Sequence, residues 1–160
     1  MLKQRFERIR RNGLIDIEGE LPVFEKEFGG KRPAWNSLTP QQQERWITEM
    51  ATYAAMIEIM DDCIGEVIKA TKEKGIFDNT IFLFLSDNGA TNEGDMITQL
   101  RADLSNTPFR SYKQWCFQGG TSAPLIIMYG GGQPDGKKEA VRHEFTHIID
   151  LFPTCLDMAS

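Results

Sequence analysis

The sequence predicts an α/β fold, a sheet flanked by helices, and three segments carry that prediction. Residues 80–85 and 123–129 are short apolar runs that are rich in β-forming residues and have the length of strands. Their almost continuous apolar character is typical of strands covered on both faces. In residues 40–74, apolar side chains recur at a spacing that places them on one face of a long helix.

The long helix has predicted start and stop signals. We expect it to begin at the Ser37-Leu38-Thr39-Pro40 segment, where a capping residue precedes a first-turn proline. It should run to Lys74, because Gly75 can adopt the left-handed conformation that ends a helix. Asp61 falls on the apolar stripe of this helix, so its carboxylate is expected to find partners by capping a turn or bonding to the backbone.

The segments on either side are predicted from simpler signals. The basic opening, residues 1–13, is expected to present a solvated helix face. A polar loop is predicted from Ser86 to about Thr107, between the two strands. A closing helical segment is predicted from about Glu144, with a kink or a break at Pro153.

Composition excludes several classes of protein. With 160 residues, 41% hydrophobic and 26% charged, the chain fits one domain or a piece of a larger one. A net charge of −5 opposes non-specific binding to nucleic acid. Its apolar runs are far shorter than the roughly 20 residues that cross a bilayer, and no signal-like apolar segment follows the basic opening. The three scattered cysteines indicate neither a disulfide framework nor a structural zinc site.

Asp87 and Asn88 directly follow the first predicted strand. In open α/β sheets, ligands bind outside the carboxyl ends of strands. A carboxylate and an amide oxygen are hard donors that suit Ca²⁺ or Mg²⁺. Taken alone, Asn88-Gly89 is also typical of a tight hairpin, which would need a partner strand directly after it. The polar stretch 90–95 follows instead, which favours a loop that forms a site.

Several segments together resemble the arylsulfatases of the sulfatase family. The resemblance lies in Tyr53–Asp61, the helix through Gly65, Asp78-Asn79-Thr80, and the strand ending in Ser86-Asp87-Asn88-Gly89. It implies a partial alkaline-phosphatase-like sheet flanked by helices. It also implies that Asp87 and Asn88 ligate a divalent cation, usually calcium, which in that family binds the sulfate and the nucleophile.

Lys113 lies in a second similar segment, ahead of Gly119-Gly120 and Pro124. In sulfatases a lysine at this place leads through a short loop to a Gly-Gly pair and a strand, and it contacts the sulfate oxygens. The resemblance implies that role for Lys113, and a compact ammonium suits a place where negative charge accumulates.

The loop around Lys113 departs from the family pattern in ways that bear on the substrate. Gln118 stands where a glutamate is common, and Ser122 stands where an arginine is frequent. Trp115 and Phe117 belong to a bulkier loop than the family's usual one. They either line an aryl or sugar pocket or anchor the loop in the core.

A rival motif stands near the end of the chain. His143-Glu144-Phe145-Thr146-His147 is a literal H-E-x-x-H, which on a helix presents two imidazoles to zinc with the glutamate as base. No G-x-x-H follows it, and Pro153 interrupts the helix. Residues 147–156 also resemble the Asp-x-x-Pro-Thr region near the end of the sulfatase catalytic domain. A zinc metalloprotease is therefore the lesser alternative, and both histidines are expected to be structural or to flank the substrate.

The resemblance runs from about Leu14 to Ser160 and corresponds to the later part of the family's catalytic domain. Residues 1–160 are expected to be its C-terminal portion, without the N-terminal half. The C/S-x-P-S-R motif that yields the formylglycine nucleophile does not occur in them. This chain alone should be inactive, and the expected partner is a small sulfate ester or a sulfated sugar. A phosphoester or phosphonate hydrolase of the same superfamily and a non-catalytic remnant stay open as alternatives.

Overall fold

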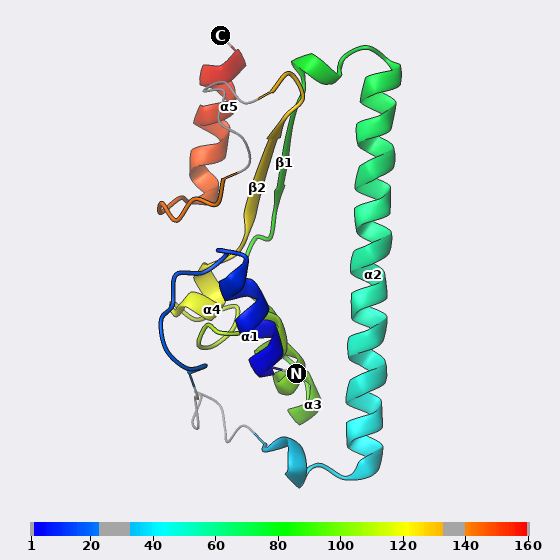
Figure 1. The fold of residues 1–160 in the computed structure, drawn as a ribbon, viewed down its shortest axis with the longest axis vertical. Coiled ribbons are helices and arrows are strands. Elements are labelled where there is room, and N and C mark those ends of the chain that lie inside the picture. Colours follow the sequence, from blue (N-terminus) through cyan, green and yellow to red (C-terminus); the bar gives the residue numbers. More distant parts are fainter. Residues whose placement is uncertain (1, 23–32, 133–139, 160) are drawn as a thin grey trace.

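The computed structural model describes residues 2–22, 33–132 and 140–159. A lobe at one end holds α1 (Leu2–Arg11), α3 (Met96–Asn106) and α4 (Gln118–Thr121), and the strands β1 (Ile81–Leu85) and β2 (Leu125–Tyr129) extend from it (Figure 1). The long helix α2 (Pro40–Glu73) runs beside both, between the 3-10 turns η1 (Trp35–Ser37) and η2 (Phe77–Asn79). A third turn, η3 (Ile148–Asp150), leads into α5 (Leu151–Ala159). This mixture of helices and strands is the predicted α/β class.

α2 begins and ends where the sequence predicts. The Thr39 hydroxyl accepts the Gln42 N–H at 3.3 Å, and the Gln42 side chain accepts the Thr39 N–H at 2.8 Å. This reciprocal capping box precedes Pro40, whose missing N–H costs nothing in the first turn. At the far end Gly75 has a φ of +68°, the left-handed conformation that ends a helix. The predicted helix from the capping segment to Lys74 is confirmed.

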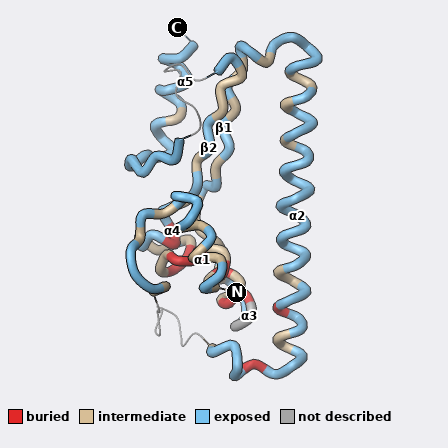
Figure 2. The backbone as a smooth tube through the Cα atoms, in the orientation of Figure 1, coloured by how far each residue is buried: buried red, intermediate tan, exposed pale blue. Residues whose placement is uncertain are grey.

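The described residues cover only the first turns of the apolar face of α2. Trp46 is buried, whereas Ile57 is 42% exposed and Asp61 is also exposed. Figure 2 shows the helix exposed along most of its length. The expectation that Asp61 lies on a covered face is therefore wrong for the described residues, because none of them packs over the middle of α2.

The core of the lobe joins α2 to α3 and α1. Its buried side chains are Leu38, Trp46, Leu100 and Leu104, with Leu2 and Met50 packed against them. Phe6 of α1 is fully buried, and the Arg5 guanidinium donates to the Ser105 carbonyl oxygen at 3.2 Å. The basic side chains of Lys3, Arg8 and Arg11 are exposed, so the predicted helix with a solvated basic face is confirmed.

α3 lies inside the segment predicted as a polar loop, 86–107, and that prediction is wrong. The Asp95 carboxylate accepts the Thr98 N–H at 3.1 Å, which satisfies one of the free N–H groups at the start of the helix. Leu100 and Leu104 stand one turn apart and reach the core. The cap and the apolar pair together explain why a helix forms in an otherwise polar stretch.

β1 and β2 pair antiparallel, with Ile81 opposite Tyr129 and Leu85 opposite Leu125. This register places the start of β2 beside the end of β1, so the loop leaving one strand meets the loop entering the other. Both strands were predicted to be covered on both faces, and among the described residues that cover is missing. Ile126, for example, is 58% exposed.

The C-terminal helix starts later than predicted. Residues 140–147 have no helical structure, and η3 and α5 begin at Ile148. His147 caps this start, because its Nδ1 accepts the Ile149 N–H at 3.2 Å and its own N–H donates to Asp150 at 2.8 Å. Pro153 is the third residue of α5, where its missing N–H breaks no helical bond. The kink or break expected at Pro153 does not occur, because α5 begins only two residues before the proline and continues past it to Ala159.

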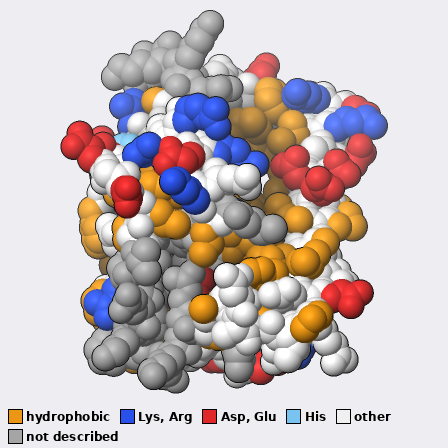
Figure 3. Space-filling view, turned by 60° about the horizontal axis from the view of Figure 1, so that its bottom comes forward, with side chains coloured by type: hydrophobic (Ala, Val, Ile, Leu, Met, Phe, Trp, Pro, Cys, Tyr) orange, Lys and Arg blue, Asp and Glu red, His pale blue; other side chains and the backbone are white. Residues whose placement is uncertain are grey.

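Apolar side chains also reach the surface of the lobe. Seen from below, they line a recess between groups of charged side chains (Figure 3).

Within residues 2–22, 33–132 and 140–159, none of the helices combines the length and the apolar character that crossing a membrane requires.

Candidate functional site

The loop that leaves β1 and the loop that enters β2 are joined by backbone hydrogen bonds. The bonds run from Ser86 N to Pro124 O at 3.3 Å, from Gly89 N to Gly120 O at 3.1 Å, and from Lys113 N to Ala90 O at 3.1 Å. The antiparallel register of the sheet brings the two loops to one place, and these bonds hold them there. The backbones of Ala90 and Lys113 are therefore neighbours, although 23 positions separate them in the sequence.

Three glycines permit this close approach. A Cβ atom at Gly89 would overlap the carbonyl oxygen of Gly119, and one at Gly119 would overlap that of Ser111. A Cβ at Gly120 would overlap the carbonyl oxygen of Trp115. Each clash is with backbone, which cannot move aside as a flexible side chain can. Gly89 therefore permits the contact between the two loops, whereas Gly119 and Gly120 permit the second loop to fold closely on itself.

Asn106, the last residue of α3, ties both loops to the lobe. Its Oδ1 accepts the Ala90 N–H at 3.0 Å, and its Nδ2 donates to the Ser111 carbonyl oxygen at 2.9 Å. One amide side chain therefore bridges the segment after Asn88 and the segment before Lys113. Sequence reasoning missed this residue, because its place at the end of α3 depends on a helix that was predicted as a loop.

Asp87 and Asn88 stand directly after β1. The Asp87 side chain is exposed and that of Asn88 is half-buried. The Ser86 hydroxyl donates to the Asn88 carbonyl oxygen at 2.8 Å, which shapes the turn after the strand. A carboxylate and an amide in this position can offer two oxygen donors to a hard divalent cation. Within the described residues, His, Cys, Asp and Glu form no group of three suited to a metal ion.

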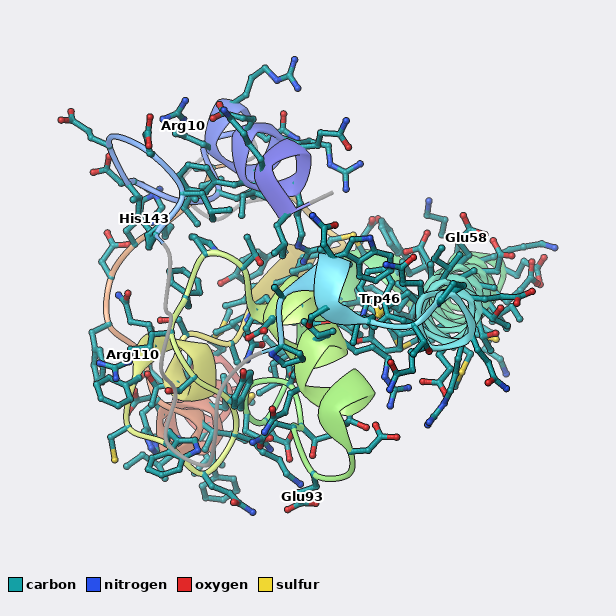
Figure 4. The ribbon with its side chains drawn as sticks, turned by 90° about the horizontal axis from the view of Figure 1, so that it is seen from below. Arg10, Trp46, Glu58, Glu93, Arg110 and His143 are labelled. Carbon is teal, nitrogen blue, oxygen red and sulfur yellow. The ribbon has the colours of Figure 1, made fainter. Side chains whose placement is uncertain are left out.

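The Lys113 ammonium lies 3.3 Å from one carboxylate oxygen of Glu93. The other oxygen of that carboxylate accepts the Gln114 side-chain N–H at 2.8 Å. The Lys113 side chain is 29% exposed. Glu93 lies at the rim of the lobe (Figure 4). Glu93 was not singled out in the sequence, because a loop glutamate carries no signal of its partner.

The aromatic residues of the Lys113 loop are partly engaged. The Arg110 guanidinium lies 4.3 Å from the centre of the Phe117 ring, a cation–π arrangement. Trp115 is half-buried, and its backbone N–H donates to the Tyr112 carbonyl oxygen at 3.2 Å. Phe117 is nevertheless 36% exposed, so its contact with Arg110 does not bury it in the core, and both predicted roles stay open.

The two histidines do not form the arrangement that a zinc protease needs. His143 and His147 lie in residues 140–147, which are not helical, so the helix that would place their rings one turn apart is missing there. His143 lines a pocket of ≈ 490 Å³ together with Arg10 and residues of the 13–19 loop. Figure 4 shows His143 beside Arg10, on the opposite side of the lobe from Glu93. The protease alternative loses its geometric basis.

Comparison with known proteins assigns the family. The sulfatase family model matches residues 20–160. An uncharacterized sulfatase of Schizosaccharomyces pombe is 30% identical over an alignment of 188 positions, which covers 98% of this chain and 32% of that protein. The arylsulfatase of Klebsiella aerogenes is 29% identical over an alignment of 185 positions, which covers 98% of this chain and 38% of that enzyme. Human N-acetylgalactosamine-6-sulfatase is 32% identical over 112 residues, 70% of this chain and 20% of that enzyme.

The chain belongs to the sulfatase family, whose members hydrolyse sulfate esters, and its fold is part of the alkaline-phosphatase-like architecture. It spans about a third of the length of the curated relatives that it matches along nearly its whole extent.

Proposed function

We propose that residues 1–160 are the C-terminal portion of a sulfatase catalytic domain and supply three groups to a sulfate-ester site. These groups are the side chains of Asp87, Asn88 and Lys113. The observation that supports the proposal is the hydrogen bond from Lys113 N to Ala90 O, 3.1 Å, which draws the lysine loop to the loop that carries the other two residues.

The proposed cation is Ca²⁺, with Mg²⁺ as the alternative. Asp87 and Asn88 offer hard oxygen donors at a place that solvent reaches. Two protein donors are fewer than the roughly six to eight oxygens that Ca²⁺ takes, so the chain alone should bind it weakly. When bound, the ion supplies positive charge that polarises the sulfate group and lowers the pKa of an attacking hydroxyl.

The proposed role of Lys113 is to donate hydrogen bonds to the sulfate oxygens. An ammonium has three N–H donors, and one directed at Glu93 leaves two for a ligand. Its charge stabilises the negative charge that develops as the ester bond breaks. The formylglycine nucleophile is expected in a preceding part of the domain, and the substrate class is a sulfate ester or a sulfated sugar.

Calcium binding tests the metal half of the proposal. Addition of calcium to the full chain should shift the amide resonances of residues 87–90 in a saturable way, and Asp87→Asn should abolish the shift. Asp78→Asn is a matched control, because Asp78-Asn79 is the same pair of residue types and precedes β1, with an Asp side chain that is exposed like that of Asp87. Equal calcium affinity in the wild type and Asp87→Asn, or equal loss in both variants, would contradict the assignment.

A further inference from the structure

The Glu93 carboxylate holds two consecutive residues of the proposed sulfate-binding loop. One oxygen lies 3.3 Å from the Lys113 ammonium, and the other accepts the Gln114 amide at 2.8 Å. Gln114 has a φ of +76°, a conformation that L-residues adopt at a cost. An interaction with a fixed partner can offset that cost, so Glu93 also helps to set the path of this loop.

This pair differs from an isolated surface ion pair because the loop partly covers the lysine. The Lys113 side chain is 29% exposed, whereas that of Glu93 is 60% exposed. The Lys113 backbone is fixed by its hydrogen bond to Ala90. The carboxylate occupies one side of the ammonium, so an anion that reaches the ammonium shares it with Glu93.

We propose that Glu93 is a specificity-determining residue, which disfavours dianionic phosphate esters relative to monoanionic sulfate esters at Lys113. This inference rests on the proposed function of Lys113. A sulfate monoester carries one negative charge, whereas a phosphate monoester carries about 1.5 to 2 at neutral pH. A fixed carboxylate beside the anion site repels the dianion about twice as strongly, because the Coulomb energy is proportional to the ligand's charge.

The distances set the size of the effect. An anion hydrogen-bonded to the ammonium, with Glu93 3.3 Å from the same nitrogen, would have its charge centre about 6 Å from the carboxylate. At that separation in a water-like dielectric, repulsion weakens binding roughly threefold per unit of ligand charge. Removal of the Glu93 charge should therefore strengthen binding of a monoanion about threefold and of a dianion about tenfold.

Glu93→Gln tests this with two ligands of similar shape and different charge. The glutamine keeps a side-chain oxygen for the Gln114 amide and removes only the charge. Affinities of methyl sulfate and of methyl phosphate at pH 8, where the phosphate is dianionic, are measured on the full chain by NMR titration of the backbone amides of residues 113 and 114, which every variant keeps. We expect the gain in affinity to be about three times larger for methyl phosphate than for methyl sulfate.

Two further variants separate the possible failures. Glu66→Gln removes the charge of another glutamate that pairs with a lysine, Lys69 at 3.6 Å on α2, and should leave both affinities unchanged. Lys113→Met should abolish binding of both ligands. If methyl sulfate binds equally well to Lys113→Met and the wild type, the proposed function of Lys113 fails. If binding depends on Lys113 but Glu93→Gln changes both affinities by the same factor, or neither, the specificity role alone is overturned.

Discussion

Gly89 and Gly119 approach so closely that a Cβ atom on the first would overlap the carbonyl oxygen of the second. The two glycines belong to the loop that leaves β1 and to the short helix ahead of β2. The hydrogen bond from Gly89 N to Gly120 O, 3.1 Å, reinforces the contact. This contact holds together the two segments on which the proposed site depends.

Gly89→Ala should destabilise the chain. The added methyl group meets backbone atoms, so the loops must move apart, and overpacking of this kind costs about 1–3 kcal/mol. Urea denaturation monitored by circular dichroism measures the change. Gly65→Ala is the matched control, because Gly65 lies within α2 with nothing near its Cβ position, and this variant should gain roughly 1 kcal/mol. A wild-type midpoint for Gly89→Ala would show that the loops do not meet as described.

Two substitutions of Asn106 should separate the contributions of its two side-chain hydrogen bonds to stability. Asn106→Asp keeps an acceptor for the Ala90 N–H but loses the donor to the Ser111 carbonyl oxygen, whereas Asn106→Leu loses both. Each lost partner of a partly buried group should cost about 1–3 kcal/mol. Hydrogen exchange at the Ala90 amide gives the specific readout, with protection retained in the aspartate variant and lost in the leucine variant. A rapidly exchanging Ala90 amide in the wild type would exclude the bond.

Asp95 should make the stability of the lobe depend on pH. The hydrogen bond from the Thr98 N–H, supported by Arg45, holds the pKa of the Asp95 carboxyl below its ordinary value of 3.8. The unfolded state therefore binds this proton more readily, so the stabilisation is present above about pH 3.8 and is lost as pH falls through the folded-state pKa. Asp95→Asn should flatten this part of the curve of unfolding free energy against pH. An unchanged slope between wild type and variant would contradict the assignment.

The H-E-x-x-H segment should bind no stoichiometric zinc. His143 and His147 lie outside any helix, and the His147 ring nitrogen already accepts the Ile149 N–H at 3.2 Å. Metal analysis of chain dialysed against zinc should give the same low content for the wild type and for His143→Ala. One zinc per chain in the wild type, lost in the variant, would restore the protease alternative.

Local signals in the sequence predicted the elements that local chemistry determines. The capping box at Thr39 and the glycine at position 75 bound α2, and the β-forming apolar runs became β1 and β2. The sequence also predicted that Asp87 and Asn88 directly follow a strand. These predictions succeed because the interactions involved span only a few residues.

The rest could not be predicted because it depends on contacts between distant segments. Glu93 forms an ion pair with Lys113, which is 20 positions away in the sequence. Asn106 is placed by α3, a helix that the polar sequence did not predict. The cover expected for the strands failed for a different reason. An apolar pattern indicates that a strand can be covered but not which segments cover it, and Ile126 stays 58% exposed among the described residues.

The proposed site requires that the Asp87–Asn88 pair and Lys113 face one pocket that takes a cation and an anion together. The most direct test is the affinity of the full chain for methyl sulfate, followed at the Lys113 ammonium with and without saturating calcium. A shared pocket predicts that calcium strengthens binding about fivefold or more and that Asp87→Asn removes this gain. Equal affinities with and without calcium would place the two ligands at independent sites and contradict the account.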